Sequence, residues 1–214
     1  MAELITGLDA DTIRRNLEAV REAVGEDVEI LAAIKYVATD ELAVLAEAGV
    51  TVVGENRAQA LQEKHAAHGD AFTAWDFIGH LQSRKVKDVV PLARLIHSVG
   101  SDSALAQVAR HGTPDTRILL EVNVAQEEGK SGIDPAELPR MLDAARAAGV
   151  QVDGLMTMPP LAPEAEQNRR WFAALAELAA THALRELSMG TSQDYAVAAS
   201  EGATIVRVGS SLYR

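Results

Sequence analysis

The strongest constraint on the fold is a regular alternation between short runs of β-branched and other apolar residues and longer segments rich in Ala, Leu and Glu. Eight such runs are predicted to be strands, at about 28–35, 50–54, 74–79, 94–99, 116–123, 151–156, 184–189 and 203–208. Helices are predicted at about 9–24, before the first strand, and after each of the first seven strands, at about 39–48, 55–68, 83–92, 101–111, 134–148, 163–182 and 193–201. Eight βα units in a chain of 214 residues predict an α/β fold, a single TIM-type (β/α)8 barrel with an extra N-terminal helix.

The domain organisation follows from the same pattern. No low-complexity linker or change of composition interrupts the alternation, so residues 1–214 are predicted to form one domain. An open, Rossmann-like sheet is the alternative architecture. It is disfavoured because no Gly-x-Gly-x-x-Gly motif follows any predicted strand.

The composition limits the classes of partner. A formal net charge of -11 argues against a general nucleic-acid or anionic-membrane binder. The chain has no cysteine, which excludes disulfides and thiolate metal sites. His65 and His68 lie three residues apart but lack an identifiable third ligand, so we expect no metal site. No targeting segment or membrane-length apolar run is present, and we expect a cytoplasmic protein.

One lysine stands out among the five of the chain. Lys35 ends the apolar run of the first predicted strand, whereas Lys64, Lys85, Lys87 and Lys130 lie in polar stretches that predict helix surface or loop. An ammonium buried at such a position is costly, which favours the free amine that attacks carbonyl compounds. The alternative is a lysine at a strand end whose charge reaches water.

The ends of the last two predicted strands are rich in Gly and Ser. The seventh strand runs into Ser188-Met189-Gly190-Thr191-Ser192, and the eighth into Arg207-Val208-Gly209-Ser210-Ser211. In a (β/α)8 barrel, functional groups gather at the C-terminal strand ends, and the loops after strands seven and eight commonly hold phosphate. These two segments therefore predict a phosphate site, although either of them alone is also typical of a simple turn.

A lysine and a phosphate site on opposite sides of one barrel mouth match the needs of pyridoxal 5'-phosphate (PLP), which carries an aldehyde and a phosphate. Arg207 would then point inward beneath the pyridine ring. Because a guanidinium keeps its proton, it would leave the ring nitrogen unprotonated and weaken the ring as an electron sink. A buried ion pair with an acidic neighbour is the alternative role for Arg207.

Several segments in fixed order resemble the pyridoxal phosphate homeostasis protein family, over about residues 10–212. They are Ile34-Lys35, Gly54-Glu55-Asn56-Arg57-Ala58-Gln59, Asp76-Phe77-Ile78-Gly79-His80-Leu81-Gln82-Ser83-Arg84-Lys85, Glu121-Val122-Asn123, Glu128-Gly129-Lys130-Ser131-Gly132, Gly154-Leu155-Met156-Thr157-Met158-Pro159-Pro160, Ser188-Met189-Gly190-Thr191-Ser192-Gln193-Asp194 and Val206-Arg207-Val208-Gly209-Ser210. The resemblance implies the barrel that is also found as the N-terminal domain of alanine racemase. It also implies a set of cofactor-binding residues, with Lys35 as the Schiff-base lysine, Ser188, Gly209 and Ser210 around the phosphate, Arg207 near the pyridine nitrogen, and Asn56, His80 and Met189 lining the pocket.

Two functions are compatible with this resemblance. The first is a carrier that holds PLP on Lys35 and buffers it or delivers it to PLP-dependent apo-enzymes by transient contact, as a monomer. The alternative is a PLP-dependent amino-acid racemase, which needs a second base on the ring face opposite the lysine. Alanine racemase supplies a tyrosine from an additional domain across a dimer, and no such domain is predicted here. Tyr36 is expected to point away from Lys35, and Tyr195 and Tyr213 to lie outside the mouth, so the carrier is favoured.

Overall fold

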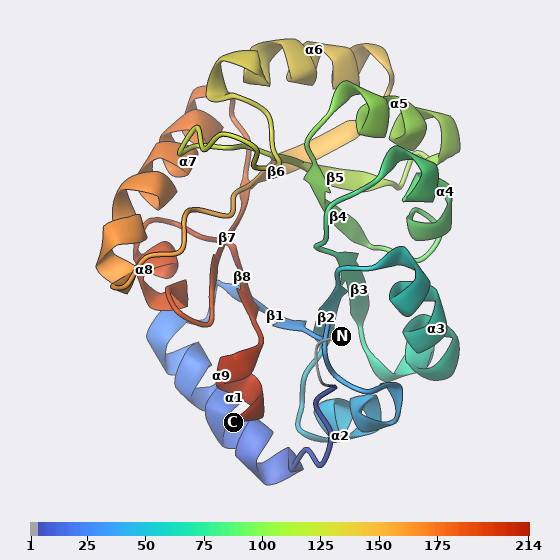
Figure 1. Ribbon diagram of the computed structural model, residues 1–214, viewed down its shortest axis with the longest axis vertical. Helices are drawn as coiled ribbons and strands as arrows, with labels where there is room; N and C mark the ends of the chain where they lie inside the picture. Colours follow the sequence, from blue (N-terminus) through green and yellow to red (C-terminus); the bar gives the residue numbers. More distant parts are fainter. Residues whose placement is uncertain (1–3) are drawn as a thin grey trace.

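The computed structural model describes residues 4–214 and contains a closed barrel of eight parallel strands in chain order (Figure 1). The strands are β1 (Glu29–Ala33), β2 (Val52–Glu55), β3 (Ala74–Phe77), β4 (Leu95–Val99), β5 (Arg117–Glu121), β6 (Gln151–Met156), β7 (Glu186–Thr191) and β8 (Ile205–Val208). The barrel closes because β8 pairs with β1, in a register that places Arg207 beside Leu31. The predicted (β/α)8 barrel is thereby confirmed.

The helices form a ring around the strands (Figure 1). They are α1 (Ala10–Val24), α2 (Leu42–Glu47), α3 (Ala58–His68), α4 (Val86–Val89), α5 (Asp102–His111), α6 (Leu138–Ala147), α7 (Arg169–Thr181), α8 (Tyr195–Ser200) and α9 (Ser210–Tyr213). Short 3-10 turns are η1 (Thr39–Glu41), η2 (Gly69–Ala71), η3 (Ser83–Lys85), η4 (Pro135–Glu137) and η5 (Ala165–Asn168). Among residues 4–214, no helix combines the length and the hydrophobicity that a bilayer span requires.

Apolar side chains pack in two separate layers. The larger cluster fills the space between the strands and the helices, where alternate residues of each strand face outward. A small cluster inside the barrel consists of Leu31, Val52, Ala74, Leu95, Leu119, Met156 and Ile205. Other interior positions of the strands carry polar and charged side chains, among them Asp76, His97, Ser188 and Arg207.

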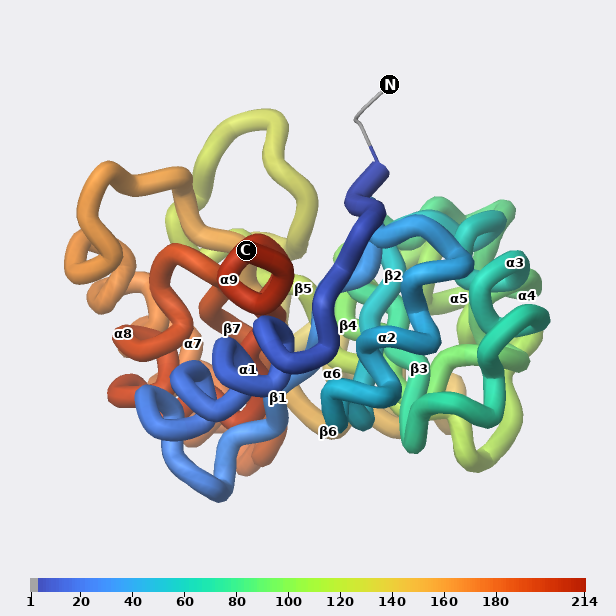
Figure 2. The backbone as a smooth tube through the Cα atoms, turned by 90° about the horizontal axis from the view of Figure 1, so that it is seen from below, coloured from blue at the N-terminus to red at the C-terminus, as the bar shows by residue number. Residues whose placement is uncertain are grey.

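The extra N-terminal helix α1 lies beside the last turn of the chain, α9 (Figure 2). Asn16 of α1 donates hydrogen bonds from Nδ2 to the carbonyl oxygens of Leu212, at 3.1 Å, and Arg214, at 2.8 Å. The sequence did not predict α9, because a helix of four residues leaves no periodic pattern. The first and last described helices therefore lie against each other, and α9 contributes to the barrel mouth.

Several observed strands are shorter than predicted. The first predicted strand ran to Lys35, but β1 ends at Ala33, and Lys35 lies in a turn that the Val37 N–H closes on the Ile34 carbonyl at 3.0 Å. An apolar run continues past the end of a strand when the following turn is also packed against the core, as Ile34 and Val37 are. Period and composition alone do not mark that boundary.

Gly154 of β6 is required by close packing of backbone. A Cβ at this position would lie 1.9 Å from the carbonyl oxygen of Glu186 on β7. We expect Gly154→Ala to lower the free energy of unfolding by about 3 kcal/mol, because only a shift of the backbone relieves the overlap. Chemical denaturation measures this loss.

Gly149→Ala is the matched control, because its Cβ would meet nothing within 4 Å and the substitution only places alanine at a φ of +70°. We expect it to cost about 1 kcal/mol. Equal losses in the two variants would contradict the packing argument.

Candidate ligand-binding site

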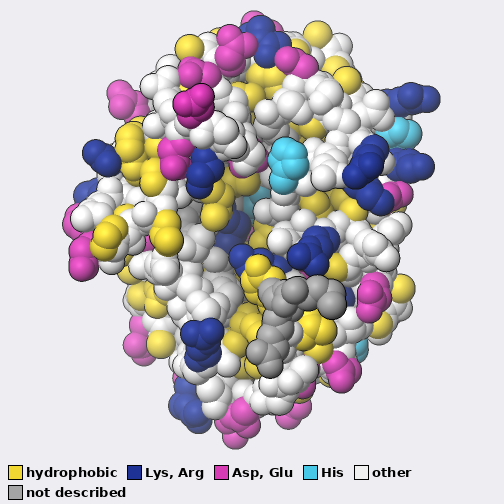
Figure 3. All heavy atoms as spheres, viewed as in Figure 1, with side chains coloured by type: hydrophobic (Ala, Val, Ile, Leu, Met, Phe, Trp, Pro, Cys, Tyr) yellow, Lys and Arg dark blue, Asp and Glu magenta, His cyan; other side chains and the backbone are white. Residues whose placement is uncertain are grey.

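A cavity of about 560 Å³ opens at the C-terminal ends of the strands, where the sequence placed the site. Its walls come mainly from the segments that follow β1, β2, β3, β6, β7 and β8, and from α9. The lining residues are Ile5, Ala33, Lys35, Tyr36, Asn56, Ile78, Gly79, Met158, Thr191, Ser192, Gln193, Arg207, Gly209, Ser210, Tyr213 and Arg214. Basic and hydrophobic side chains lie next to each other around the centre of this face of the molecule (Figure 3). The cavity thus combines cationic and apolar walls.

Lys35 lies at this cavity, but it is not buried as the sequence suggested. Lys35 is exposed, because it belongs to the turn after β1 and not to the strand itself. Its Nζ lies 5.2 Å from the ring centroid of Tyr36, which lines the same cavity. The expectation that Tyr36 would point away from Lys35 is therefore wrong, since strand alternation does not hold in a turn.

The buried lysine of the chain is Lys64, which we expected on the surface of a helix. Lys64 of α3 is 5% exposed and donates from Nζ to Glu55 Oε2 at 2.7 Å and to the Ile34 carbonyl oxygen at 2.6 Å. Glu55 is fully buried, and its Oε1 accepts the backbone N–H of Asn56 at 2.6 Å. This ion pair holds two cavity segments: the peptide before Lys35 and the start of the loop after β2.

The loops after β7 and β8 meet at the cavity as predicted, and Gly209 and Ser210 line it. Ser192 Oγ accepts the backbone N–H groups of Gly209 at 3.0 Å and Ser211 at 3.3 Å, so these two amides converge on one oxygen position. The loops do not lie opposite Lys35 as expected. Because the barrel closes through β1 and β8, they lie next to it.

Ser188, Met189 and His80 do not line the cavity, contrary to our expectation. Ser188 is fully buried inside the barrel, where its Oγ contacts His97 and Arg207. Met189, the next residue of β7, faces outward into the larger hydrophobic cluster. His80 is exposed beyond the end of β3. The direction of each of these side chains depends on strand register and loop path, which the sequence pattern does not give.

Arg207 lines the cavity from β8 and points into the barrel. It is 5% exposed and donates to Ser188 Oγ at 2.5 Å and to the Thr157 carbonyl oxygen at 2.9 Å. Within residues 4–214 the Arg207 guanidinium forms no ion pair with a carboxylate, so the alternative role as a buried ion pair does not apply there. Burial lowers the pKa of Arg207 to about 10, which still leaves the group charged at neutral pH.

Asn56 lines the cavity beside the end of β2. Its Oδ1 is buried and has no hydrogen-bond partner among residues 4–214. Gly79 lies next to it, and a Cβ there would come within 2.0 Å of the Asn56 carbonyl oxygen. Buried acceptors are normally paired, so the Asn56 oxygen indicates a place where a ligand or water donates.

Tyr213 is a cavity residue that the sequence reading placed outside the mouth. It belongs to α9, and its hydroxyl donates to the Ala33 carbonyl oxygen at 3.1 Å. Burial raises the pKa of the Tyr213 hydroxyl, so the group remains protonated. The packing of α9 against α1 brings it there, and no local sequence signal marks that contact.

The Lys64–Glu55 pair predicts a large effect on stability. We expect Lys64→Met to lower the free energy of unfolding by about 3–5 kcal/mol, because it leaves the Glu55 carboxylate buried without its cation. Lys85→Met is the control, since Lys85 and Asp88 form a half-buried but solvent-accessible pair at 3.5 Å, worth less than about 1 kcal/mol. Denaturant titration of both variants measures the difference, and similar losses would contradict a structural role for Lys64.

Comparisons with known proteins agree with this geometry. The family model for the alanine racemase N-terminal domain matches residues 8–214. The pyridoxal phosphate homeostasis protein of Aquifex aeolicus is 35% identical over 219 residues, covering 95% of this chain and 96% of the relative. The protein of the same name from Deinococcus radiodurans is 37% identical over 203 residues, covering 93% of this chain and 95% of the relative.

A solved structure is similar to this chain in both fold and sequence. PipY of Synechococcus elongatus PCC7942 is 31% identical, and the match covers 94% of this chain and 100% of PipY. The TM-score is 0.85 for PipY without PLP and 0.82 for PipY with PLP bound. Because the family model matches residues 8–214 and these relatives are similar over nearly the whole chain, the chain belongs to the pyridoxal phosphate homeostasis protein family.

Proposed function

We propose that this protein binds PLP in the cavity at the barrel mouth, on Lys35, and buffers it or delivers it to PLP-dependent apo-enzymes. The observation that carries the proposal is one cavity containing a lysine amine, a buried arginine and the Gly- and Ser-rich loops after β7 and β8. The names of the relatives and the PLP-bound structure of PipY support the same function.

The charge and the size of the cavity fit an anionic cofactor. The chain has a net charge of -11, yet the described cavity lining includes Lys35, Arg207 and Arg214 and no aspartate or glutamate. Its volume of about 560 Å³ lies within the range of small-molecule sites, about 300–1,000 Å³. A cationic cavity in an acidic protein concentrates an anionic ligand at that position.

The described residues divide the binding task among them. When bound, PLP supplies an aldehyde carbon that a lysine amine can attack. Lys35 provides that amine at the cavity surface, and the hydroxyls of Ser192 and Ser210 provide donors for a phosphate. The backbone N–H of Gly209, which donates to Ser192 Oγ, adds a further donor where a phosphate oxygen takes the place of that hydroxyl. Asn56 Oδ1, buried and without a partner among residues 4–214, provides an acceptor.

Arg207 gives the main physical reason for a carrier. Its charged guanidinium donates hydrogen bonds but does not supply a proton, so it favours an unprotonated pyridine nitrogen and opposes carbanion chemistry. The tyrosines do not readily provide a second base: Tyr213 is protonated and donates to the Ala33 carbonyl, and Tyr36 lies next to Lys35 in the same turn. These features favour reversible binding over racemisation.

We further infer that the protein acts as a cytoplasmic monomer that meets its apo-enzymes transiently. The described cavity is lined from a single chain, with α9 and the N-terminal segment around Ile5 contributing to its wall. A site assembled within one chain does not depend on a partner subunit.

Borohydride reduction tests the attachment site. After incubation with one equivalent of PLP and reduction, we expect peptide mass spectrometry to find the pyridoxyl group on Lys35, because this is the lysine at the cavity. Lys87, which is exposed and does not line the cavity, is the internal control. Labelling of Lys87 to the same extent, or no labelling of Lys35, would refute the proposed site.

Exchange at the Cα of amino acids tests the carrier against the racemase. We expect L-alanine and a panel of other L-amino acids in D2O to exchange far more slowly with the PLP-loaded protein than the roughly 10 turnovers per second of a median enzyme. The same preparation is expected to transfer PLP to an apo-enzyme, and Lys35→Ala is expected to change that transfer. Stereoinversion at an ordinary enzymatic rate that Lys35→Ala abolishes would make the protein a racemase.

A further inference from the structure

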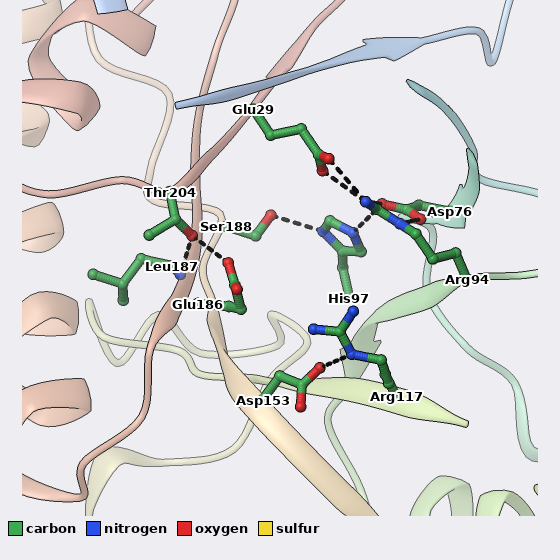
Figure 4. Close-up of polar contacts among 10 residues, drawn as sticks. All are labelled: Glu29, Asp76, Arg94, His97, Arg117, Asp153, Glu186, Leu187, Ser188 and Thr204. Atoms are coloured by element: carbon green, nitrogen blue, oxygen red, sulfur yellow. Dashed lines mark hydrogen bonds and ion pairs between the residues drawn. The ribbon is translucent and has the colours of Figure 1, made fainter. Parts of the chain in front are cut away.

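A line of polar side chains crosses the interior of the barrel beneath the cavity. It consists of Glu29, Arg94, Asp76, His97, Ser188 and Arg207, and the first five are drawn in Figure 4. Asp76, His97 and Ser188 are fully buried. The interior of such a barrel is usually filled by apolar side chains. Six connected polar side chains in their place indicate a role other than packing.

The lower end of the line is anchored by Arg94. Its guanidinium donates to both carboxylate oxygens of Glu29, at 2.6 and 2.8 Å, and to both oxygens of Asp76, at 2.6 and 2.9 Å. Burial alone would raise the pKa of Asp76, but hydrogen bonds from His97 and Arg94 hold it below its usual range. Asp76 is therefore a fixed carboxylate facing His97.

The Asp76 carboxylate, which only accepts, and the Arg207 guanidinium, which only donates, determine the donor and the acceptor of each hydrogen bond between them. His97 Nε2 lies 3.0 Å from Asp76 Oδ2 and donates, because an ionised carboxylate only accepts. His97 Nδ1 is then an acceptor and takes the hydroxyl proton of Ser188, at 2.8 Å. The Ser188 oxygen in turn accepts from Arg207, which only donates. The three hydrogen bonds between Arg207 and Asp76 therefore run in one direction, from Arg207 through Ser188 and His97 to Asp76.

A neutral His97 is required by this arrangement. The line then contains the two guanidinium cations of Arg94 and Arg207 and the two carboxylates of Glu29 and Asp76, whereas a protonated ring would add a third cation and lose its acceptor. Burial lowers the pKa of His97 from 6.5, outweighing the opposite effect of Asp76. The lower pKa agrees with the hydrogen-bond directions.

We propose that His97 is a positioning residue that, as its neutral Nε2–H tautomer, fixes the Ser188 hydroxyl as an acceptor and thereby holds Arg207 at the base of the ligand cavity. The proposal rests on the proposed function in one respect, that the ligand contacting Arg207 is PLP. Ser188, expected to bind phosphate directly, acts through Arg207 instead. Nη2 of Arg207 donates to the Thr157 carbonyl oxygen and contacts Met158 Sδ, both at 2.9 Å, whereas Nη1 donates to Ser188. The direction of the Nη1 side of the guanidinium therefore depends on Ser188, and through it on His97.

NMR of the protein without PLP tests the first half of the proposal. We expect the His97 ring to show the Nε2–H tautomer and no titration as the pH falls through 6.5. The guanidinium protons of Arg207 are expected to exchange slowly, and faster in His97→Leu. A ring protonated on Nδ1 or titrating near 6.5, or unchanged Arg207 exchange in His97→Leu, would overturn the proposal without involving PLP.

A double-mutant cycle on PLP binding tests the second half. We expect His97→Leu to weaken PLP binding on the order of tenfold and to shift the absorption maximum of the bound cofactor, but to change affinity less than twofold when Arg207 is already Gln. His97→Gln, whose amide can both donate to Asp76 and accept from Ser188, is expected to restore wild-type affinity and spectrum. It also provides a folded comparison if His97→Leu is unstable.

Equal effects of His97→Leu in the presence and absence of Arg207 would show that His97 acts only through general stability, and would overturn the positioning role. A His97→Gln protein that is folded but shows the His97→Leu spectrum would do the same. Failure of the wild-type protein to bind PLP at all would refute the proposed function instead, and the NMR results would still decide the role of His97.

Discussion

The pairing of β8 with β1 is the interaction on which the rest of the structure depends. It closes the sheet, leaves no free edge, and sets the register in which Arg207 lies beside Leu31. It also makes the last strand end a neighbour of the first, so that Gly209 and Lys35 border one cavity although they lie far apart in the sequence. The contact of α9 with α1 adds Tyr213 to the same wall.

The barrel interior contains both an apolar cluster and a line of polar and charged side chains. Part of it is a small hydrophobic cluster, while the polar line leads from Glu29 and Arg94 to Arg207 at the cavity. Buried charges are tolerated when each is paired and hydrogen-bonded, and here each carboxylate of the line meets a guanidinium. Such a network determines the orientation of Arg207 more narrowly than apolar packing would.

The two lysines near the cavity differ in burial and in pairing. Lys64 is buried and paired with Glu55, and it holds the backbone on either side of the site. Lys35 is exposed at the cavity and has no such partner among residues 4–214, which leaves its amine accessible. A structural ion pair therefore supports the segment that presents the accessible amine of Lys35.

The sequence by itself determined the number and order of the strands, because apolar periodicity is a local property, and it located Lys35, Asn56, Arg207, Gly209 and Ser210 at the strand ends that form the cavity. Which side chains face that cavity was decided by the tertiary structure. The strand register places Ser188 inside the barrel and Met189 outside it. Lys35 is exposed because β1 ends before it, and Lys64 is buried because Glu55 lies beside it. These outcomes depend on contacts between residues distant in the chain, and a linear pattern of residue types carries no information on such distances.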